Sequence, residues 1–133
     1  MTGMTALLIY IVWTLILALS YATYRLPLVL TGKKAANHWE RGKDVDDPAI
    51  LIRAKAAHLN SLENLPLFAA LVLIAAATGQ SDTVNAVASF VVAARIGQSL
   101  VHLVGTSFPL VFIRASLFLA QVALMLYLAF ALL

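Results

Sequence analysis

The sequence predicts an all-α membrane protein in which a single domain, residues 1–133, forms an antiparallel bundle of four transmembrane helices. The chain is 62% hydrophobic and only 11% charged, whereas an ordinary soluble domain is about 45–50% apolar and about 25% charged. The excess apolar surface must therefore face lipid. Twelve of the fifteen charged side chains lie between Arg25 and Glu63, so the remainder of the chain consists of long stretches with almost no charge.

The first span is expected at residues 5–30. A helix needs about 20 largely apolar residues to cross a hydrocarbon core of about 30 Å. The apolar stretch from Ala6 to Tyr24 is longer than the apolar region of a signal peptide, and no basic residue precedes it. We therefore expect a retained span, followed by a polar loop at 33–51.

Three further spans are expected at 52–78, 83–104 and 109–132. Two short turns separate them, Thr78–Asp82 and Gly105–Pro109, and both contain the Gly, Ser, Asp or Pro residues that are typical of turns. Connections this short join only antiparallel neighbours.

All Lys and Arg side chains fall on one side of this four-span topology. They lie in or beside the first and third loops, at positions 25, 33, 34, 41, 43, 53, 55, 95 and 114. Basic residues are retained in the cytoplasm, and acidic ones matter little. The pattern therefore predicts that these loops are cytoplasmic and that both termini lie on the non-cytoplasmic side.

Each of the last three spans gathers its polar residues on one face, at about 100° of helical rotation per residue. The polar faces contain Arg53, Asn60, Glu63 and Asn64 on the second span, Arg95, Gln98, Ser99 and His102 on the third, and Arg114 and Gln121 on the fourth. Ionisable groups at membrane depth cost roughly 2.5–3.5 kcal/mol each on insertion scales, so they are usually paired or functional.

Two interpretations of these polar faces stay open. The side chains could hold the helices to one another, because Asn, Gln, Ser and His form hydrogen bonds across helix interfaces in membranes. This interpretation is weaker for Glu63 and Arg114, because Glu63 has four candidate cations in nearby stretches, more than one structural pair requires. A cluster with this excess of positive charge is typical of a site for an anionic, amphipathic ligand.

The segment from Arg53 to Phe68 resembles the signature of the MAPEG family, the membrane-associated proteins in eicosanoid and glutathione metabolism. The second helix of that family carries a pattern of the form R-A-H-x-N-x-x-E-N-x-P-x-F. This chain matches it at His58, Asn60, Glu63, Asn64, Pro66 and Phe68. The resemblance extends over the whole chain, and it is closest to bacterial members similar to the microsomal glutathione transferases.

The resemblance implies a homotrimer in a bacterial inner membrane, with glutathione bound as co-substrate at subunit interfaces and a hydrophobic substrate entering from lipid. Carried over by position, Arg114 would stabilise the glutathione thiolate and act as the catalytic residue. Asn60 and Glu63 would bind the glutathione backbone, and Arg53 and Arg95 its carboxylates. Gln98 and His102 are two further candidates for binding glutathione, because they stand at motif positions of the third helix.

Three departures from the family pattern weaken the expected glutathione site. Ala56 replaces the arginine two positions before His58, so one anion contact is either missing or supplied from elsewhere. The third helix has Arg95-x-x-Gln98-x-x-x-His102 where the family has R-x-x-H-x-x-x-Y. Phe118 stands where some members have a tyrosine, and a phenylalanine cannot donate a hydrogen bond to a thiolate.

The leading prediction for function is an integral membrane glutathione transferase or peroxidase that acts on hydrophobic electrophiles or lipid hydroperoxides. The alternative is a non-catalytic MAPEG-like protein that binds lipid or a partner protein, and the three departures favour it. A small four-span drug exporter is disfavoured, because such exporters carry their acidic residue in the first helix. The chain has no cysteine and three scattered histidines, which predicts no metal site, and nothing in it resembles a nucleic-acid-binding module.

Overall fold

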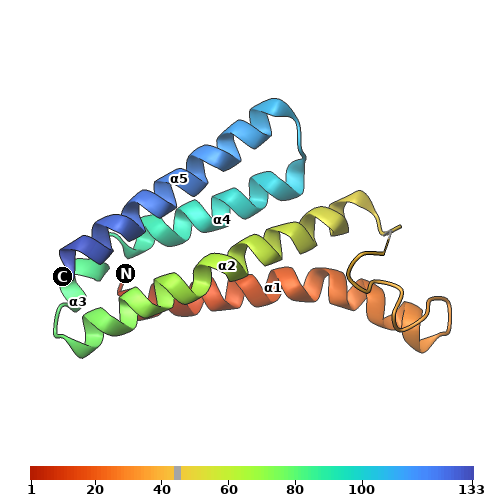
Figure 1. Cartoon of the computed structure of the whole chain (residues 1–133), viewed down its shortest axis with the longest axis horizontal. Helices are drawn as coiled ribbons and strands as arrows, with labels where there is room; N and C mark the ends of the chain where they lie inside the picture. The colour runs from red at the N-terminus through yellow and green to blue at the C-terminus, as the bar shows by residue number, and fades with distance from the viewer. Residues whose placement is uncertain (44–45) are drawn as a thin grey trace.

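The computed structural model describes residues 1–43 and 46–133, and these residues form helices joined by loops, with no strand among them. The helices are α1 (Gly3–Leu30), α2 (Ala49–Ala77), α3 (Ser81–Asn85), α4 (Ala88–Val104) and α5 (Phe108–Ala131). Figure 1 shows two antiparallel pairs, α1 with α2 and α4 with α5. Contacts of α4 with both α2 and α1 join the pairs into one bundle.

Both chain termini lie at one end of the bundle, beside α3 (Figure 1). We call this the terminal end. The opposite end, which we call the loop end, contains the α1–α2 connection and the turn between α4 and α5. Because α2 and α5 both begin at the loop end, they run parallel to each other.

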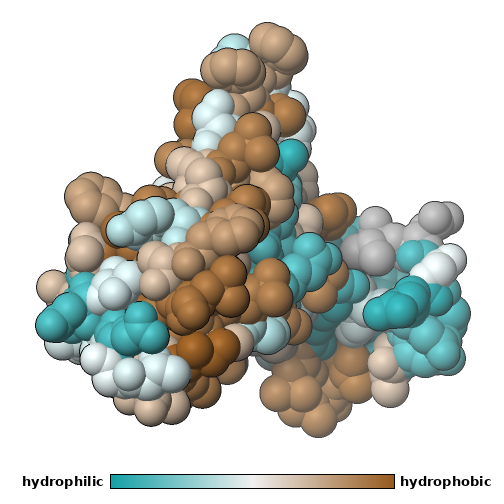
Figure 2. Space-filling model, turned by 60° about the vertical axis from the view of Figure 1, so that its left-hand side comes forward, coloured by the Kyte–Doolittle hydropathy of each residue, from teal (hydrophilic) through white to brown (hydrophobic). Residues whose placement is uncertain are grey.

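Three of the helices, α1, α2 and α5, are long and apolar enough to cross a membrane, and α4 is a shorter apolar helix. At about 1.5 Å per residue, the 17 residues of α4 span about 26 Å, slightly less than a hydrocarbon core. Figure 2 shows hydrophobic side chains over much of the visible face, with hydrophilic ones at the lower left and in a band from the middle to the right. The chain is therefore an integral membrane protein, as its composition predicts.

The third expected span, 83–104, is divided in the structure. Residues 81–85 form the separate short helix α3, and Val87 leaves helical geometry before α4 begins at Ala88. The physical reason is packing, because α3 turns beneath the start of α1 and buries Val84 there. The other three spans, expected at 5–30, 52–78 and 109–132, correspond to α1, α2 and α5 with ends displaced by a few residues.

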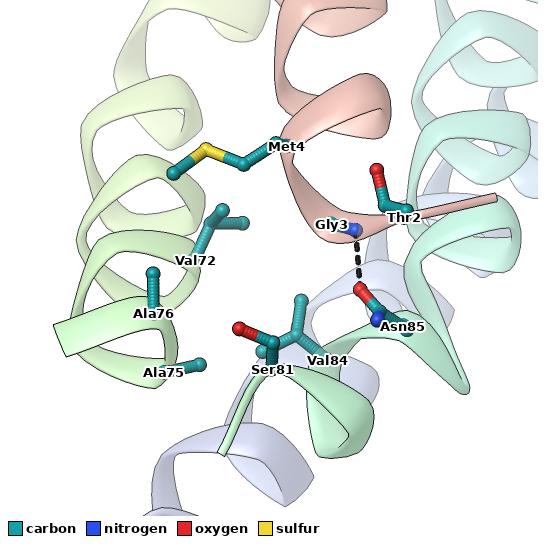
Figure 3. A pocket seen from close by; sticks show the side chains of 9 residues that line it. All are labelled: Thr2, Gly3, Met4, Val72, Ala75, Ala76, Ser81, Val84 and Asn85. Carbon is teal, nitrogen blue, oxygen red and sulfur yellow. Dashed lines mark hydrogen bonds between the residues drawn. The ribbon is translucent and has the colours of Figure 1, made fainter. Parts of the chain in front are cut away.

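The packing of α3 against α1 is close. The backbone N–H of Gly3 donates to Oδ1 of Asn85 at 2.7 Å, which satisfies one of the free donors at the start of α1 (Figure 3). Val84 lies so near Gly3 that a Cβ on Gly3 would be 2.8 Å from Val84 Cγ1. A pocket of about 250 Å³ beside this contact is lined mainly by small and apolar side chains of α1, α2 and α3.

The apolar core fills the terminal half of the bundle. Tyr10 and Phe68 are fully buried there and stack with ring centroids 5.9 Å apart. Small residues such as Ala6, Ala75 and Ala88 lie between the helices, and they let the backbones approach closely. This core holds the helices together in the terminal half of the bundle, next to the polar residues described below.

The connection between α1 and α2 is held against the loop end by one buried carboxylate. Asp47 accepts hydrogen bonds from Nη2 of Arg25 at 3.0 Å and from Nε1 of Trp39 at 2.8 Å. The Arg25 guanidinium also lies 5.0 Å from the ring of Tyr21 and 5.1 Å from that of Trp39. The expected polar loop, 33–51, includes residues 44 and 45, which are outside the described residues.

A second acidic residue of this connection is exposed and paired with two bases. Asp46 accepts from Nζ of Lys34 at 2.6 Å and lies 2.8 Å from Nε2 of His38. The hydrogen bond from Lys34, followed by that from His38, holds the pKa of Asp46 well below its usual range. At neutral pH the connection therefore carries a fixed carboxylate at its surface.

Candidate functional site

The centre of the bundle contains a buried arginine. Arg95, on α4, has a relative exposure of 1%, although it lies at the depth of an apolar span. Its Nη1 donates to Oδ1 of Asn60 on α2 at 2.9 Å, and its Nη2 donates to Oε1 of Gln121 on α5. One guanidinium thus connects three helices.

The first helix also contributes to this network, through a residue that the sequence did not identify. The hydroxyl of Tyr10 donates to the backbone oxygen of Ser61 at 3.1 Å and accepts from Nε2 of Gln121 at 3.4 Å. The Arg95 guanidinium carbon lies 5.8 Å from the centre of the Tyr10 ring. Thr14, one turn after Tyr10, lies 2.8 Å from Oγ of Ser61.

Tyr10 and Thr14 were missed because a tyrosine in an apolar helix resembles an interfacial anchor or a core residue. The available signal was their spacing, because two hydroxyl residues at i and i+4 share one face of a helix that is otherwise apolar. We name the set Tyr10, Asn60, Arg95, Gln98 and Gln121 the central polar cluster.

The central polar cluster has one donor and one acceptor to spare. Nε of Arg95 and Oε1 of Gln98 are buried without a hydrogen-bond partner in the part of the chain that the structure describes. Nε2 of Gln98 points to Oδ1 of Asn60 at 3.4 Å, so Asn60 accepts from both neighbours. Unpaired buried polar atoms are costly and call for a ligand or water. A peptide-like ligand has the N–H and C=O groups that would satisfy them.

A second group of basic residues gathers at the loop end. Nε of Arg53, near the start of α2, donates to the backbone oxygen of Leu103 at 3.0 Å and so satisfies a free carbonyl in the last turn of α4. His102 lies within electrostatic range of both Arg53 and Arg114. We name Arg53, His102 and Arg114 the loop-end basic cluster. All three are half-buried, and no ion pair with a carboxylate forms at any of them within residues 1–43 and 46–133.

Glu63 differs from both groups because its side chain is exposed on the single protomer. It follows the inward-facing Asn60 by three residues and lies at the rim of the α2 face that packs into the bundle. Its charge acts on Arg95, yet it forms no ion pair with any described residue.

The structure therefore divides the predicted site residues. It brings Asn60, Arg95 and Gln98 into direct contact, and it places Arg53, His102 and Arg114 near one another at the loop end. Ala56 and Phe118, at two of the departures, are half-buried on α2 and α5. Among the residues described, no three His, Cys, Asp or Glu side chains gather as a metal site would require.

The polar face of α2 has Asn60 and Asn64 inside the bundle and Glu63 at its rim. The whole chain was compared with models of known protein families, and one model matches almost its full length. A model described as the MAPEG family covers residues 3–133. The chain belongs to the MAPEG family. MAPEG proteins use glutathione, and they include glutathione-dependent transferases as well as non-catalytic members. Comparison with curated proteins and with solved structures found no match.

Proposed function

We propose that this MAPEG protein is an integral membrane glutathione-dependent transferase or peroxidase that acts on hydrophobic electrophiles or lipid hydroperoxides. The observation that carries the proposal is the position of Arg53 and Arg114 within electrostatic range of His102, with no carboxylate paired to either arginine in the described chain. Such a group favours a bound anion, and glutathione is the first anion to test because MAPEG proteins use it.

The residues that were predicted to bind glutathione suit its different groups. Glutathione carries two carboxylates, an ammonium group and two peptide bonds. Arg53, in the loop-end basic cluster, matches a carboxylate, and the exposed carboxylate of Glu63 matches the ammonium group. The spare Nε of Arg95 and Oε1 of Gln98 match a peptide carbonyl and a peptide N–H.

In the proposed mechanism Arg114 lowers the pKa of the bound glutathione thiol. A free thiol has a pKa of about 8.5, and a nearby cation in a site that excludes water favours the thiolate, which is the nucleophile. In conjugation, the sulfur forms a bond to the electrophilic carbon, and either a leaving group departs with its bonding electron pair or a conjugated double bond opens and takes up a proton. In peroxide reduction, the sulfur attacks the hydroperoxide oxygen and a second glutathione completes the disulfide, giving the alcohol and water.

The exposed position of Glu63 supports assembly into the homotrimer that the family resemblance implies. A carboxylate facing lipid costs roughly 2.5–3.5 kcal/mol on insertion scales. Burial of Glu63 against a neighbouring subunit would remove this cost and place its charge in a site shared by two protomers. The proposed location is a bacterial inner membrane.

The proposal is tested by replacing Arg114. Purified Arg114→Ala should lose about 10²-fold or more in kcat for conjugation of glutathione to an aromatic electrophile, because a preorganised cation is often worth that much. Arg41→Ala is the matched control, since Arg41 is exposed in the α1–α2 connection. If wild-type protein has neither conjugating nor peroxidase activity, the proposed enzymatic function is excluded.

A non-catalytic MAPEG member that binds lipid or a partner protein is the second candidate. The observation that favours it is the use of Arg95 inside the bundle, where two of its nitrogens are already bound to Asn60 and Gln121. Phe118 also supplies no donor beside Arg114. Binding of glutathione to wild-type protein, measured by calorimetry, separates the candidates, because a lipid- or protein-binding member has no need of the thiol.

A further inference from the structure

A groove of about 470 Å³ lies along the last turns of α1, where this helix reaches the surface of the membrane. It is lined by α1 side chains between Leu19 and Val29 and by Trp39 of the α1–α2 connection. Arg25, which also lines it, is the first charged residue of the chain and follows 24 uncharged residues. Since a span needs about 20 apolar residues, Arg25 lies near the boundary between lipid tails and headgroups.

We infer that this groove binds an anionic phospholipid of the surrounding bilayer. A phosphate oxygen of the lipid accepts from Nη1 of Arg25, and one acyl chain lies along α1 towards Leu19. The inference does not depend on the proposed function, because it needs neither glutathione nor turnover.

The Arg25 guanidinium is held in one orientation with a nitrogen to spare. Its Nε and Nη2 both donate to Oδ2 of the buried Asp47, at 3.2 and 3.0 Å, and it lies about as far from the ring of Tyr21 as from that of Trp39. No hydrogen bond forms at Nη1 within residues 1–43 and 46–133. The side chain is 14% exposed, so the two N–H donors of Nη1 are available to a phosphate, which arginine binds well.

The charge around the groove suits an anionic headgroup. Residues 25–55 contain seven Lys and Arg and four Asp and Glu, a surplus of three positive charges. Lys33 and Arg41 are exposed, and neither belongs to an ion pair among the residues that the structure describes. Basic residues beside a span attract the anionic lipids of the adjacent leaflet.

The apolar part of the groove suits an acyl chain. Leu19, Ala22 and Leu26 lie at i, i+3 and i+7 on one exposed face of α1. From Leu19 to Val29 the helix rises about 15 Å, roughly along the direction of the lipid tails. Trp39 lies beside Arg25, and tryptophan is enriched at the headgroup level of membranes.

A second copy of the chain is the competing occupant. In the same membrane orientation it would bring the same surplus of positive charge to the same depth, so charge repulsion disfavours it at this position. A zwitterionic phospholipid would enter the groove without any use of the positive charge. Both occupants are outcomes of the test that contradict the inference.

The inference is tested by quenching of Trp39 fluorescence in bilayers. The chain has two tryptophans, and Trp13→Phe leaves Trp39 as the only one. Nε1 of Trp13 has no hydrogen-bond partner among the described residues, so this change removes no such bond. Lipids with bromine on carbons six and seven are diluted into plain phosphatidylcholine. Brominated phosphatidylglycerol should quench at a mole fraction about fivefold lower than brominated phosphatidylcholine, as one cation near an anionic surface provides.

In the same background, Arg25→Gln should remove the preference for phosphatidylglycerol. Lys43→Gln is the matched control and should keep it, because Lys43 is exposed in the same connection and pairs with Glu40. Equal quenching by the two lipids before either substitution would overturn the inference. A preference that survives Arg25→Gln would also overturn it.

Ala22→Phe tests the groove with Arg25 and Asp47 left in place. The larger side chain fills the path of the acyl chain, so the two brominated lipids should again quench equally. This variant decides the matter if Arg25→Gln displaces Trp39, which a shift of its emission in unbrominated lipid would reveal. A preference unchanged in Ala22→Phe, or cross-links between copies of the chain at this groove, contradicts the inference.

Discussion

Arg95 shows how a single residue can be both a family motif position and a structural centre. A charged group normally needs water around it. The Arg95 guanidinium instead contacts the side-chain oxygens of Asn60 and Gln121 and the aromatic ring of Tyr10. A hydrogen bond to a charged group is worth about 1.5–3 kcal/mol, and an orphaned partner costs as much. The orientation of Arg95 therefore depends on residues of three other helices.

Replacement of Gln121 tests this dependence. Gln121→Leu should lower the free energy of unfolding by about 1.5–3 kcal/mol, because Nη2 of Arg95 loses its acceptor in a buried site. Thermal unfolding in detergent measures the loss. Gln121→Glu keeps an acceptor and should remain near the wild-type midpoint. Equal destabilisation by both substitutions would show that the loss is one of packing and not of the hydrogen bond.

The residue types of the candidate site could be predicted from the sequence, but their partners could not. Helical spacing places Arg95, Gln98 and Ser99 on one face of α4, as the structure has them. Spacing gives no depth or rotation relative to another helix, so it does not predict the contact of Arg95 with Gln121. Tyr10 lacked any signal except its spacing from Thr14.

At the scale of elements, the short helix α3 is the feature that apolar pattern alone did not predict. No proline or glycine lies between Ser81 and Gly97, so the sequence predicts one continuous helix. The break at Val87 depends on what α3 gains against α1, namely burial of Val84 and the hydrogen bond between Asn85 and Gly3. Such long-range packing overrides a local preference.

The contact of α3 with α1 predicts an unusual response to alanine. Gly3→Ala should destabilise the protein by about 1–3 kcal/mol, because the new Cβ would meet Val84 Cγ1 at 2.8 Å. Unfolding in detergent measures this, and the penalty should disappear in a Val84→Ala background. Gly97→Ala is the control, because its Cβ would meet Leu117 at an ordinary 3.4 Å. A persistent penalty in the double variant would exclude the clash as its cause.

At the scale of the whole molecule, composition determines the membrane environment and the distribution of charge predicts the topology. Hydropathy was sufficient for the spans because lipid leaves the backbone few alternatives to helix. Hydropathy does not predict the oligomeric state, since small residues permit helices to approach closely without specifying how many subunits meet. The exposed Glu63 and the largely exposed α5 are the structural grounds for proposing a partner subunit.

The topology is open to direct measurement because the chain has no cysteine. We expect a single Lys43→Cys, in the α1–α2 connection, to be protected from a membrane-impermeant maleimide in intact spheroplasts, and a single Ser81→Cys to be labelled. The reason is the retention of basic segments in the cytoplasm. After lysis both should react. Labelling of Lys43→Cys alone before lysis would invert the predicted orientation.

The most direct measurement of the proposed function is the ultraviolet absorbance of the glutathione thiolate on purified protein at neutral pH. Wild-type protein should show a thiolate band that saturates with glutathione concentration, since in the proposed mechanism Arg114 lowers the pKa of the bound thiol. Arg114→Ala should bind glutathione with the band lost. A wild-type protein that binds glutathione without a thiolate band, or a band unchanged in Arg114→Ala, would contradict the role of Arg114.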